Sequence, residues 1–123
     1  MKRYIIVTNN ILVKNITEKK LNYRLYYVGG SVQNVISMCE ELFLNEKCHL
    51  AADPLAGRKA RPFPYLTLIL EKGEKAALED WQRITDYSAL NSARIDQYTG
   101  NSEKLNEDFR ILDCSFTKAV LKI

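Results

Sequence analysis

Apolar residues change their spacing several times along the chain, and this alternation constrains the fold more than any other feature of the sequence. Where apolar residues form a short β-branched or aromatic run, or alternate with polar ones, the spacing indicates a β-strand. The alternation is clearest at Tyr23, Leu25 and Tyr27. Four segments are expected as strands, and they span residues 4–7, 21–28, 48–52 and 65–70.

Helical spacing appears between and after these segments. From Val32 to Phe43 apolar residues recur every three or four positions, which predicts a helix whose N-cap is Ser31. Residues 74–94 carry a similar stripe, and residues 11–20 fit either a short helix or an extended connection. Further along, residues 98–106 are expected as a loop, 109–112 as a fifth strand and 115–123 as a terminal helix.

Strands that alternate with helices favour an α/β fold in which helices cover both faces of a sheet. We expect residues 1–123 to form a single domain. The expected architecture is a three-layer sandwich around a mostly parallel sheet of about four or five strands. In such sheets the carboxyl ends of the strands gather at one edge, and ligands bind there.

Three polar segments are expected at that edge, because each follows a strand: Thr8-Asn9-Asn10, Gly29-Gly30-Ser31 and the start of residues 53–65. The glycines permit close backbone approach, and the first amides of the following helix carry the positive end of its dipole. These groups suit a small anionic ligand, although glycine before an N-cap serine also builds ordinary turns. The candidate ligand-binding residues are Asn9, Asn10, Gly29, Gly30, Ser31, Gly57 and Arg58.

The segment 53–65 contains all three prolines of the chain together with several cations. Connections between neighbouring elements usually have about 2–6 residues, so this stiff and basic segment is expected to do more than connect strands. The alternative is a plain surface excursion. Asp53 is the candidate acid or base, unless it only caps a turn. The candidate partner-binding residues are Arg61, Phe63 and Tyr65.

Charge, hydropathy and cysteine usage exclude several classes of function. A net charge of +3 without a basic stripe does not indicate a nucleic-acid-binding protein. No apolar run approaches the roughly 20 residues that span a bilayer, and the N-terminus becomes polar too early for a signal peptide. We therefore expect a cytoplasmic protein with no membrane contact. The chain has an odd number of cysteines and no C-x-x-C spacing, so we expect reduced and buried thiols at Cys39, Cys48 and Cys114.

No cofactor can be assigned from these residues, and no metal site is expected. The single histidine, His49, lies within an apolar strand-like run, where a core or edge position is more common than a catalytic one. A zinc site would require all three cysteines to converge on it.

Several motifs in the first half of the chain resemble the GrdX family. They are Thr8-Asn9-Asn10, Val13-Lys14, Gly30-Ser31, Pro54-Leu55-Ala56-Gly57, Pro62 and Pro64-Tyr65, within residues 4–70. Proteins of this family are small and are encoded with the glycine, sarcosine and betaine reductase systems of anaerobic amino-acid fermentation. Their biochemical role is not established. The resemblance implies that a protein of such a reductase system is a partner.

The sequence departs from the family pattern at two places. The family typically has a histidine before Pro-Leu-x-Gly, where this chain has Asp53. In addition, Arg61-Pro62-Phe63 stands in place of a longer polar stretch. Any chemistry that depends on the family histidine would therefore not carry over to this chain.

Two functions remain open from the sequence. In the first, the protein binds an anionic metabolite or a phosphoryl group through Asn9, Asn10, Ser31 and Arg58, with or without catalysis. In the second, it is a noncatalytic accessory protein that docks a partner through residues 53–65. A homodimer fits both, because a small sheet leaves an edge or an apolar helix face to be covered.

Overall fold

The computed structural model of the chain describes residues 4–20, 22–51, 65–73, 82, 84–86 and 103–123. The elements follow in the order β1 (Tyr4–Thr8), α1 (Ile11–Thr17), β2 (Tyr23–Tyr27), α2 (Val32–Asn45), β3 (Cys48–Leu50), β4 (Thr67–Lys72) and α4 (Glu103–Leu121). Residues 82 and 84–86, within the expected helix 74–94, are helical, and the rest of that segment lies outside the described residues.

The described strands form a mixed sheet in the order β2-β1-β4-β3. Only β1 and β2 are parallel, whereas β4 runs antiparallel to both of its neighbours. The expectation of a mostly parallel sheet is therefore wrong. The continuous burial of Thr67 to Leu70 is usual for parallel strands, but a central antiparallel strand covered by helices on both faces shows it equally.

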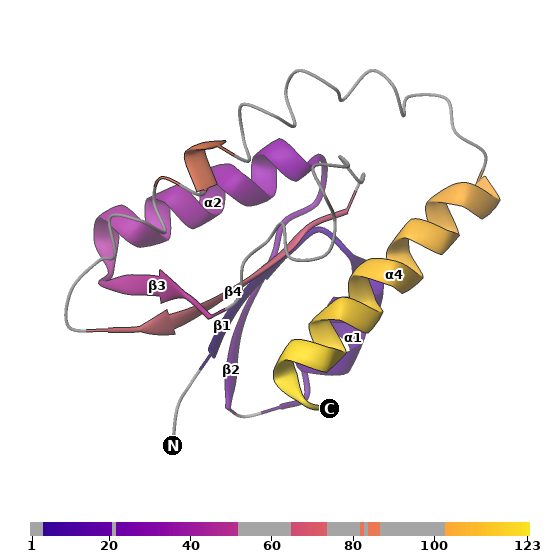
Figure 1. Cartoon of the computed structure of the whole chain (residues 1–123), viewed down its shortest axis with the longest axis horizontal. Coiled ribbons are helices and arrows are strands. Elements are labelled where there is room, and N and C mark those ends of the chain that lie inside the picture. Colours follow the sequence, from indigo (N-terminus) through magenta and orange to yellow (C-terminus); the bar gives the residue numbers. More distant parts are fainter. Residues whose placement is uncertain (1–3, 21, 52–64, 74–81, 83, 87–102) are drawn as a thin grey trace.

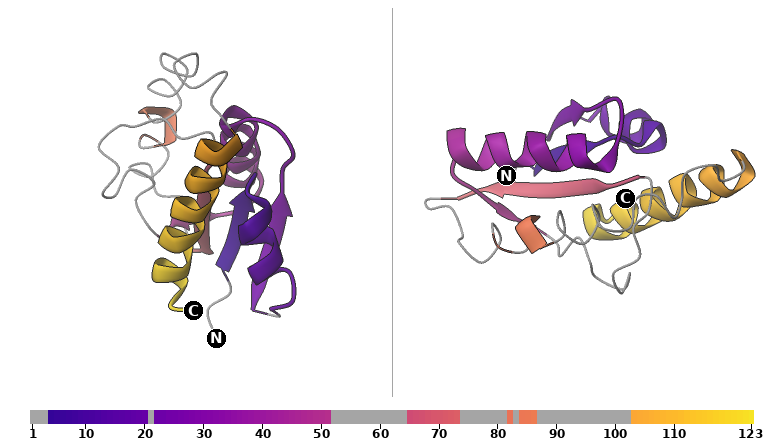
Figure 2. Two further views of the ribbon diagram at one scale, coloured as in Figure 1. Left: turned by 90° about the vertical axis from the view of Figure 1, so that its right-hand side faces the viewer. Right: turned by 90° about the horizontal axis from the view of Figure 1, so that it is seen from above.

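Helices lie on both faces of this sheet (Figure 1). α2 covers one face, and α1 and α4 lie together on the other, as the view from above in Figure 2 shows for α2 and α4. Successive strand residues point to opposite faces. Ile5 and Val7 therefore join the core under α2, while Ile6 packs with Val13 of α1 and Leu121 of α4.

The C-terminal part of the chain differs most from the expectation. The expected strand 109–112 is wrong, and so is the expected loop from Glu103 onward, because α4 is one continuous helix. Residues 98–102 lie outside the described part of the chain. Ile111 and Leu112 are 49% and 56% exposed, so this apolar run looks like a strand in the sequence without entering the core. The expected terminal helix is confirmed as the second half of α4.

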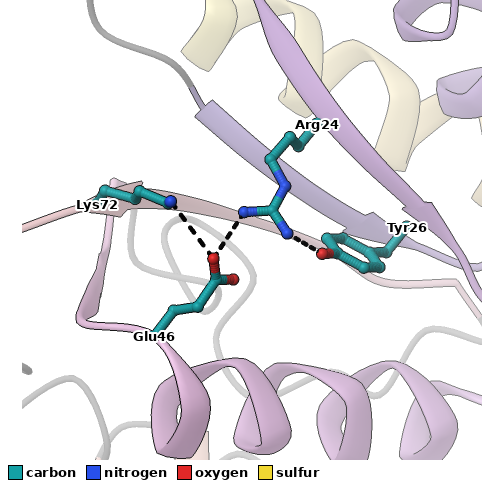
Figure 3. Close-up of polar contacts among 4 residues, drawn as sticks. All are labelled: Arg24, Tyr26, Glu46 and Lys72. Atoms are coloured by element: carbon teal, nitrogen blue, oxygen red, sulfur yellow. Dashed lines mark hydrogen bonds and ion pairs between the residues drawn. The ribbon is translucent and has the colours of Figure 1, made fainter.

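A cluster of four side chains ties the C-terminal end of α2 to the sheet (Figure 3). Glu46, the C-cap residue of α2, accepts a hydrogen bond of 2.8 Å from Arg24 of β2 and lies 3.4 Å from Lys72 Nζ of β4. Arg24 also donates to the Tyr26 hydroxyl. The hydrogen bond from Arg24 lowers the pKa of Glu46. Because β2 and β4 flank β1, this carboxylate anchors the helix on both sides of the central strand.

The three cysteines are free and buried, as the sequence predicts. Burial raises the pKa of the thiols of Cys39, Cys48 and Cys114. His49 lies on β3, the outer of the described strands beside β4, with its Nε2 3.0 Å from a carboxylate oxygen of Glu71 on β4. In the described ranges, no three His, Cys, Asp or Glu side chains gather as metal ligands do. None of the described helices has the length and apolar character required to cross a membrane.

Candidate functional site

One edge of the sheet brings together the polar segments that the sequence marks. β1 and β2 end at this edge because they are parallel, and the amide of Val28 donates to the Thr8 carbonyl at 2.8 Å just beyond them. β4 is antiparallel and therefore begins here, preceded by Tyr65 and Leu66. The edge is thus formed by two strand ends and one strand start.

Asn9 joins these segments through its side-chain amide. Its Nδ2 donates to the carbonyl of Gly30 at 3.0 Å, and its Oδ1 accepts from the amide of Leu66 at 2.9 Å. The residue is only 5% exposed. Asn9 therefore lies at the predicted edge, but its amide group holds the backbone of two neighbouring segments.

Asn10 connects the same edge to α4. Its Oδ1 caps α1 by accepting from the amide of Leu12 at 3.1 Å. Its Nδ2 donates to the carbonyl of Arg110 at 2.9 Å and to Oδ2 of Asp113 at 3.0 Å. The side chain is fully buried, so it serves as a link between α1 and α4.

Asp113 is the centre of a buried polar network between the sheet and α4. This fully buried carboxylate accepts from Thr67 Oγ1 at 2.7 Å as well as from Asn10. The hydroxyls of Thr67 and Thr8 share a hydrogen bond of 2.8 Å. Thr117, one turn along α4, donates to the Asp113 carbonyl at 2.9 Å. Such pairing is what makes a buried carboxylate tolerable in a protein core.

The turn between β2 and α2 is the open part of this edge. Gly29, Gly30 and Ser31 are all exposed. Gly30 has a φ of +117°, and a Cβ there would also collide with the side chain of Asn34. Ser31 is the N-cap of α2, as predicted, but its side chain makes no capping hydrogen bond. Its hydroxyl is therefore available to another acceptor or donor.

Two cations approach the edge from the helices on the other face. Arg110 of α4 donates from Nε to the hydroxyl of Tyr65 at 2.9 Å, and its guanidinium lies 5.2 Å from the centre of that ring. Lys14 of α1 lies 5.4 Å from the centre of the Tyr27 ring. Tyr65, a candidate partner-binding residue, is thus held against α4.

The remaining candidate residues belong to the segment between β3 and β4. Asp53, Gly57, Arg58, Arg61 and Phe63 all lie outside the described residues. The residues on either side of that segment are described, and the amide of Ala51 donates to the Ile69 carbonyl at 2.8 Å. The segment leaves the sheet after β3 and returns to it before β4.

Sequence reasoning missed the contribution of α4 to this edge. Assigning residues 109–112 to a strand separated Arg110 and Asp113 from the helix that carries them. A helical register would have placed Asp113 on the same face as Cys114, Thr117 and Leu121, all of which are buried. A carboxylate on a buried helix face is the signal that could have revealed the network.

A shallow groove lies on the outer side of the molecule, between α1 and α4. Its volume is about 290 Å³. Leu12 and Ile16 of α1 form one wall, and Ile111, Cys114 and Ser115 of α4 are part of the other. The groove lies apart from the Gly29–Ser31 turn and is mainly apolar.

The fold is that of an α/β protein with a mixed sheet, and its candidate functional edge is built around consecutive asparagines beside an open Gly-Gly-Ser turn. Residues 5–122 match the family model of GrdX, described as GrdX-like protein, and the chain therefore belongs to this family. The match extends through α4, well beyond the motifs in residues 4–70. No curated protein and no solved structure matches the sequence.

Proposed function

We propose that this GrdX-like protein binds a small anionic ligand, with a carboxylate or phosphoryl group, at the turn formed by Gly29, Gly30 and Ser31. The observation that carries the proposal is the exposed Ser31 hydroxyl, which makes no capping bond at the start of α2. The N-terminal amides of this 14-residue helix carry partial positive charge. Within α2, no acidic residue occupies the first turn to oppose an anion.

The backbone that would meet the ligand is held in place from behind. Asn9 fixes the carbonyl of Gly30, and Nδ2 of Asn34 lies 3.4 Å from the carbonyl of Gly29 as a donor. Asn9 is itself held by Leu66. A turn fixed in this way loses little conformational entropy when it binds, which favours affinity for a small ligand.

The proposal includes Gly57 and Arg58 in the same site. The segment that contains them ends before β4, at the same edge as the turn; β3, after which it begins, runs toward that edge and ends opposite Leu70, three residues from the start of β4. Arg58 supplies the cation that an anion site requires beyond backbone amides. Asp53 as an acid or base stays a prediction. If the site catalyses a reaction, Asp53→Asn keeps ligand binding and removes turnover.

A thermal-shift titration tests this proposal. The probes are inorganic phosphate, acetyl phosphate, glycine, sarcosine and betaine, the last three chosen from the reductase systems associated with the family. At about 100 times its dissociation constant, a ligand that binds only the folded chain adds roughly 2.7 kcal/mol to the free energy of unfolding. For a chain of 123 residues this raises Tm by about 10 °C.

The matched variants are Ser31→Ala and Ser37→Ala, two exposed serines at the start and in the middle of α2. Ser31→Ala is expected to weaken binding by about tenfold or more, the value of one hydrogen bond to a charged group. Ser37→Ala is expected to bind like the wild type. The proposal fails if none of the five probes shifts Tm, or if both variants bind equally well.

The second candidate function is docking of a reductase-system protein through residues 53–65. The observation that favours it is the fixed position of Tyr65, which Arg110 holds at the point where this segment rejoins the sheet. In this case Arg61→Ala and Phe63→Ala abolish binding to the purified reductase component, while Ser31→Ala leaves it unchanged. The same pair of measurements separates the two functions.

A further inference from the structure

The outer face of α4 carries a continuous stripe of exposed residues. Within it, Ile111 and Leu112 are 49% and 56% exposed, while the opposite face buries Asp113 and Thr117 completely. Residues spaced three and four apart lie on one side of a helix. The residues that share this exposed side, called the α4 stripe below, are Asp108, Ile111, Leu112, Ser115, Lys118, Ala119 and, directly after the helix, Lys122.

The order of side chains along the α4 stripe is acidic, apolar, small and basic. Asp108 is nearest the N-terminus, and Ile111 and Leu112 follow. Ser115 lies at the midpoint, and Lys118 and Lys122 form the basic end. A surface of this kind is complementary to itself when a second copy runs in the opposite direction, because each acidic end then meets a basic end.

We propose that two copies of this chain form a dimer through antiparallel pairing of their α4 stripes about a twofold axis at Ser115. With the axis at this position, Asp108 of one copy lies opposite Lys122 of the other, seven residues on either side of the centre. Ile111 then packs against Ala119. Leu112 packs against the aliphatic stem of Lys118, which can bury its methylenes while its ammonium group stays in water.

The antiparallel direction follows from charge and from helix electrostatics. A parallel pair would place Asp108 against Asp108 and Lys122 against Lys122, which is repulsive. Antiparallel neighbours also bring the positive end of each helix dipole near the negative end of the other. Ser115 and Ala119 are small, so the two helix axes can approach to about 8 Å.

The apolar surface continues beyond the stripe. The groove between α1 and α4 begins at Ile111 and Ser115 and extends to Leu12 and Ile16. Ile11, at the start of α1, is also exposed, at 39%. A second copy seated on α4 therefore shields apolar area on both helices. A second copy is favoured over an unrelated partner because, in an antiparallel pair, the acidic end of each stripe faces the basic end of the other.

The test is the molar mass of the full-length chain, measured by sedimentation equilibrium over a range of concentrations. The wild type is expected to dimerise. Asp108→Lys and Lys122→Asp each place like charges opposite one another at two symmetry-related positions, and each is expected to weaken the dimer by about tenfold. The double variant Asp108→Lys/Lys122→Asp exchanges the charges and is expected to restore the dimer.

Two further variants make the outcome specific. Glu107→Lys has the same charge change as Asp108→Lys but lies beside the stripe, so it is expected to leave the dimer intact. Leu112→Asp is expected to give a monomer with unchanged circular dichroism, because Leu112 is largely exposed. The proposal is overturned if the wild type is monomeric up to about 100 μM. It is overturned equally if Leu112→Asp remains dimeric, or if the double variant dimerises no more tightly than the two single variants.

Discussion

Replacing Asp113 with alanine is the sharpest test of how α4 is held to the sheet. The carboxylate is fully buried and accepts hydrogen bonds from Asn10 at 3.0 Å and from Thr67 at 2.7 Å. Each hydrogen bond to a charged group contributes about 1.5–3 kcal/mol. Both donors keep another partner, because Asn10 still reaches the Arg110 carbonyl and Thr67 still reaches Thr8. The loss in the free energy of unfolding is therefore expected near the lower limit for two such hydrogen bonds, at about 3–4 kcal/mol.

This loss is a large part of the 5–15 kcal/mol that stabilises a typical domain. For a chain of 123 residues, with an unfolding entropy of about 2.1 cal/mol/K per residue, it lowers Tm by roughly 12–15 °C. Urea unfolding followed by far-UV circular dichroism measures the free energy directly. Asp113→Asn keeps one acceptor oxygen at the same place, so its loss is expected to lie between those of the wild type and the alanine variant.

The matched control is Glu107→Ala, which removes an exposed carboxylate from the same helix and is expected to change stability by less than about 0.5 kcal/mol. A loss below about 1 kcal/mol for Asp113→Ala would refute the reasoning. It would mean that the cost of burying the carboxylate cancels the hydrogen bonds that it accepts.

Two other changes test the glycine turn and the cluster at the end of α2. Gly30→Ala is expected to destabilise the protein by about 1–3 kcal/mol, because Gly30 has a φ of +117° and the added Cβ would collide with Asn34. Gly29→Ala is expected to be nearly neutral, because its Cβ would meet nothing within 4 Å. Thermal unfolding of both variants measures the difference. Glu46→Gln is expected to cost about 1 kcal/mol at neutral pH. Because Arg24 lowers the folded-state pKa of Glu46, this stabilisation is complete above the unfolded pKa of about 4.3 and is lost as the pH falls through the folded value. Wild type and Glu46→Gln should therefore unfold at the same urea concentration in strong acid. If their unfolding midpoints differ there as much as at neutral pH, the stabilising role of the Glu46 carboxylate is contradicted.

The elements that the sequence predicts best are those with one buried face. β2 alternates, and α2 carries apolar residues at helical spacing from Val32 to Phe43, so burial on one side leaves a readable period. The direction of β4 could not be predicted in this way. Its central residues are buried on both faces, and the direction of such a strand depends on its connection to β3 rather than on its own residues.

The positions of the candidate site residues were easier to predict than their roles. Asn9, Asn10 and the Gly29–Ser31 turn follow the ends of β1 and β2, so a parallel pair of strands brings them to one edge. The partners of the asparagines could not be predicted, because Asn9 bonds to Leu66 and Asn10 to Asp113 across 57 and 103 positions of the chain. Only the assembled fold shows that the Asn9 amide holds the backbone of the candidate site and that the Asn10 amide links α1 to α4.

The link between Asn10 and α4 has a consequence for the order in which the protein folds. β1, α1 and β2 lie within the first 27 residues. The Asn10 amide can form its hydrogen bonds to Arg110 and Asp113 only after these residues, 100 and 103 positions later, have been synthesised. At a synthesis rate of about 5–20 residues per second, roughly 5–20 s separate these events on the ribosome. During that time α4 cannot cover the apolar side chains of β1 and α1 against which it packs in the folded protein, so this part of the core is completed last.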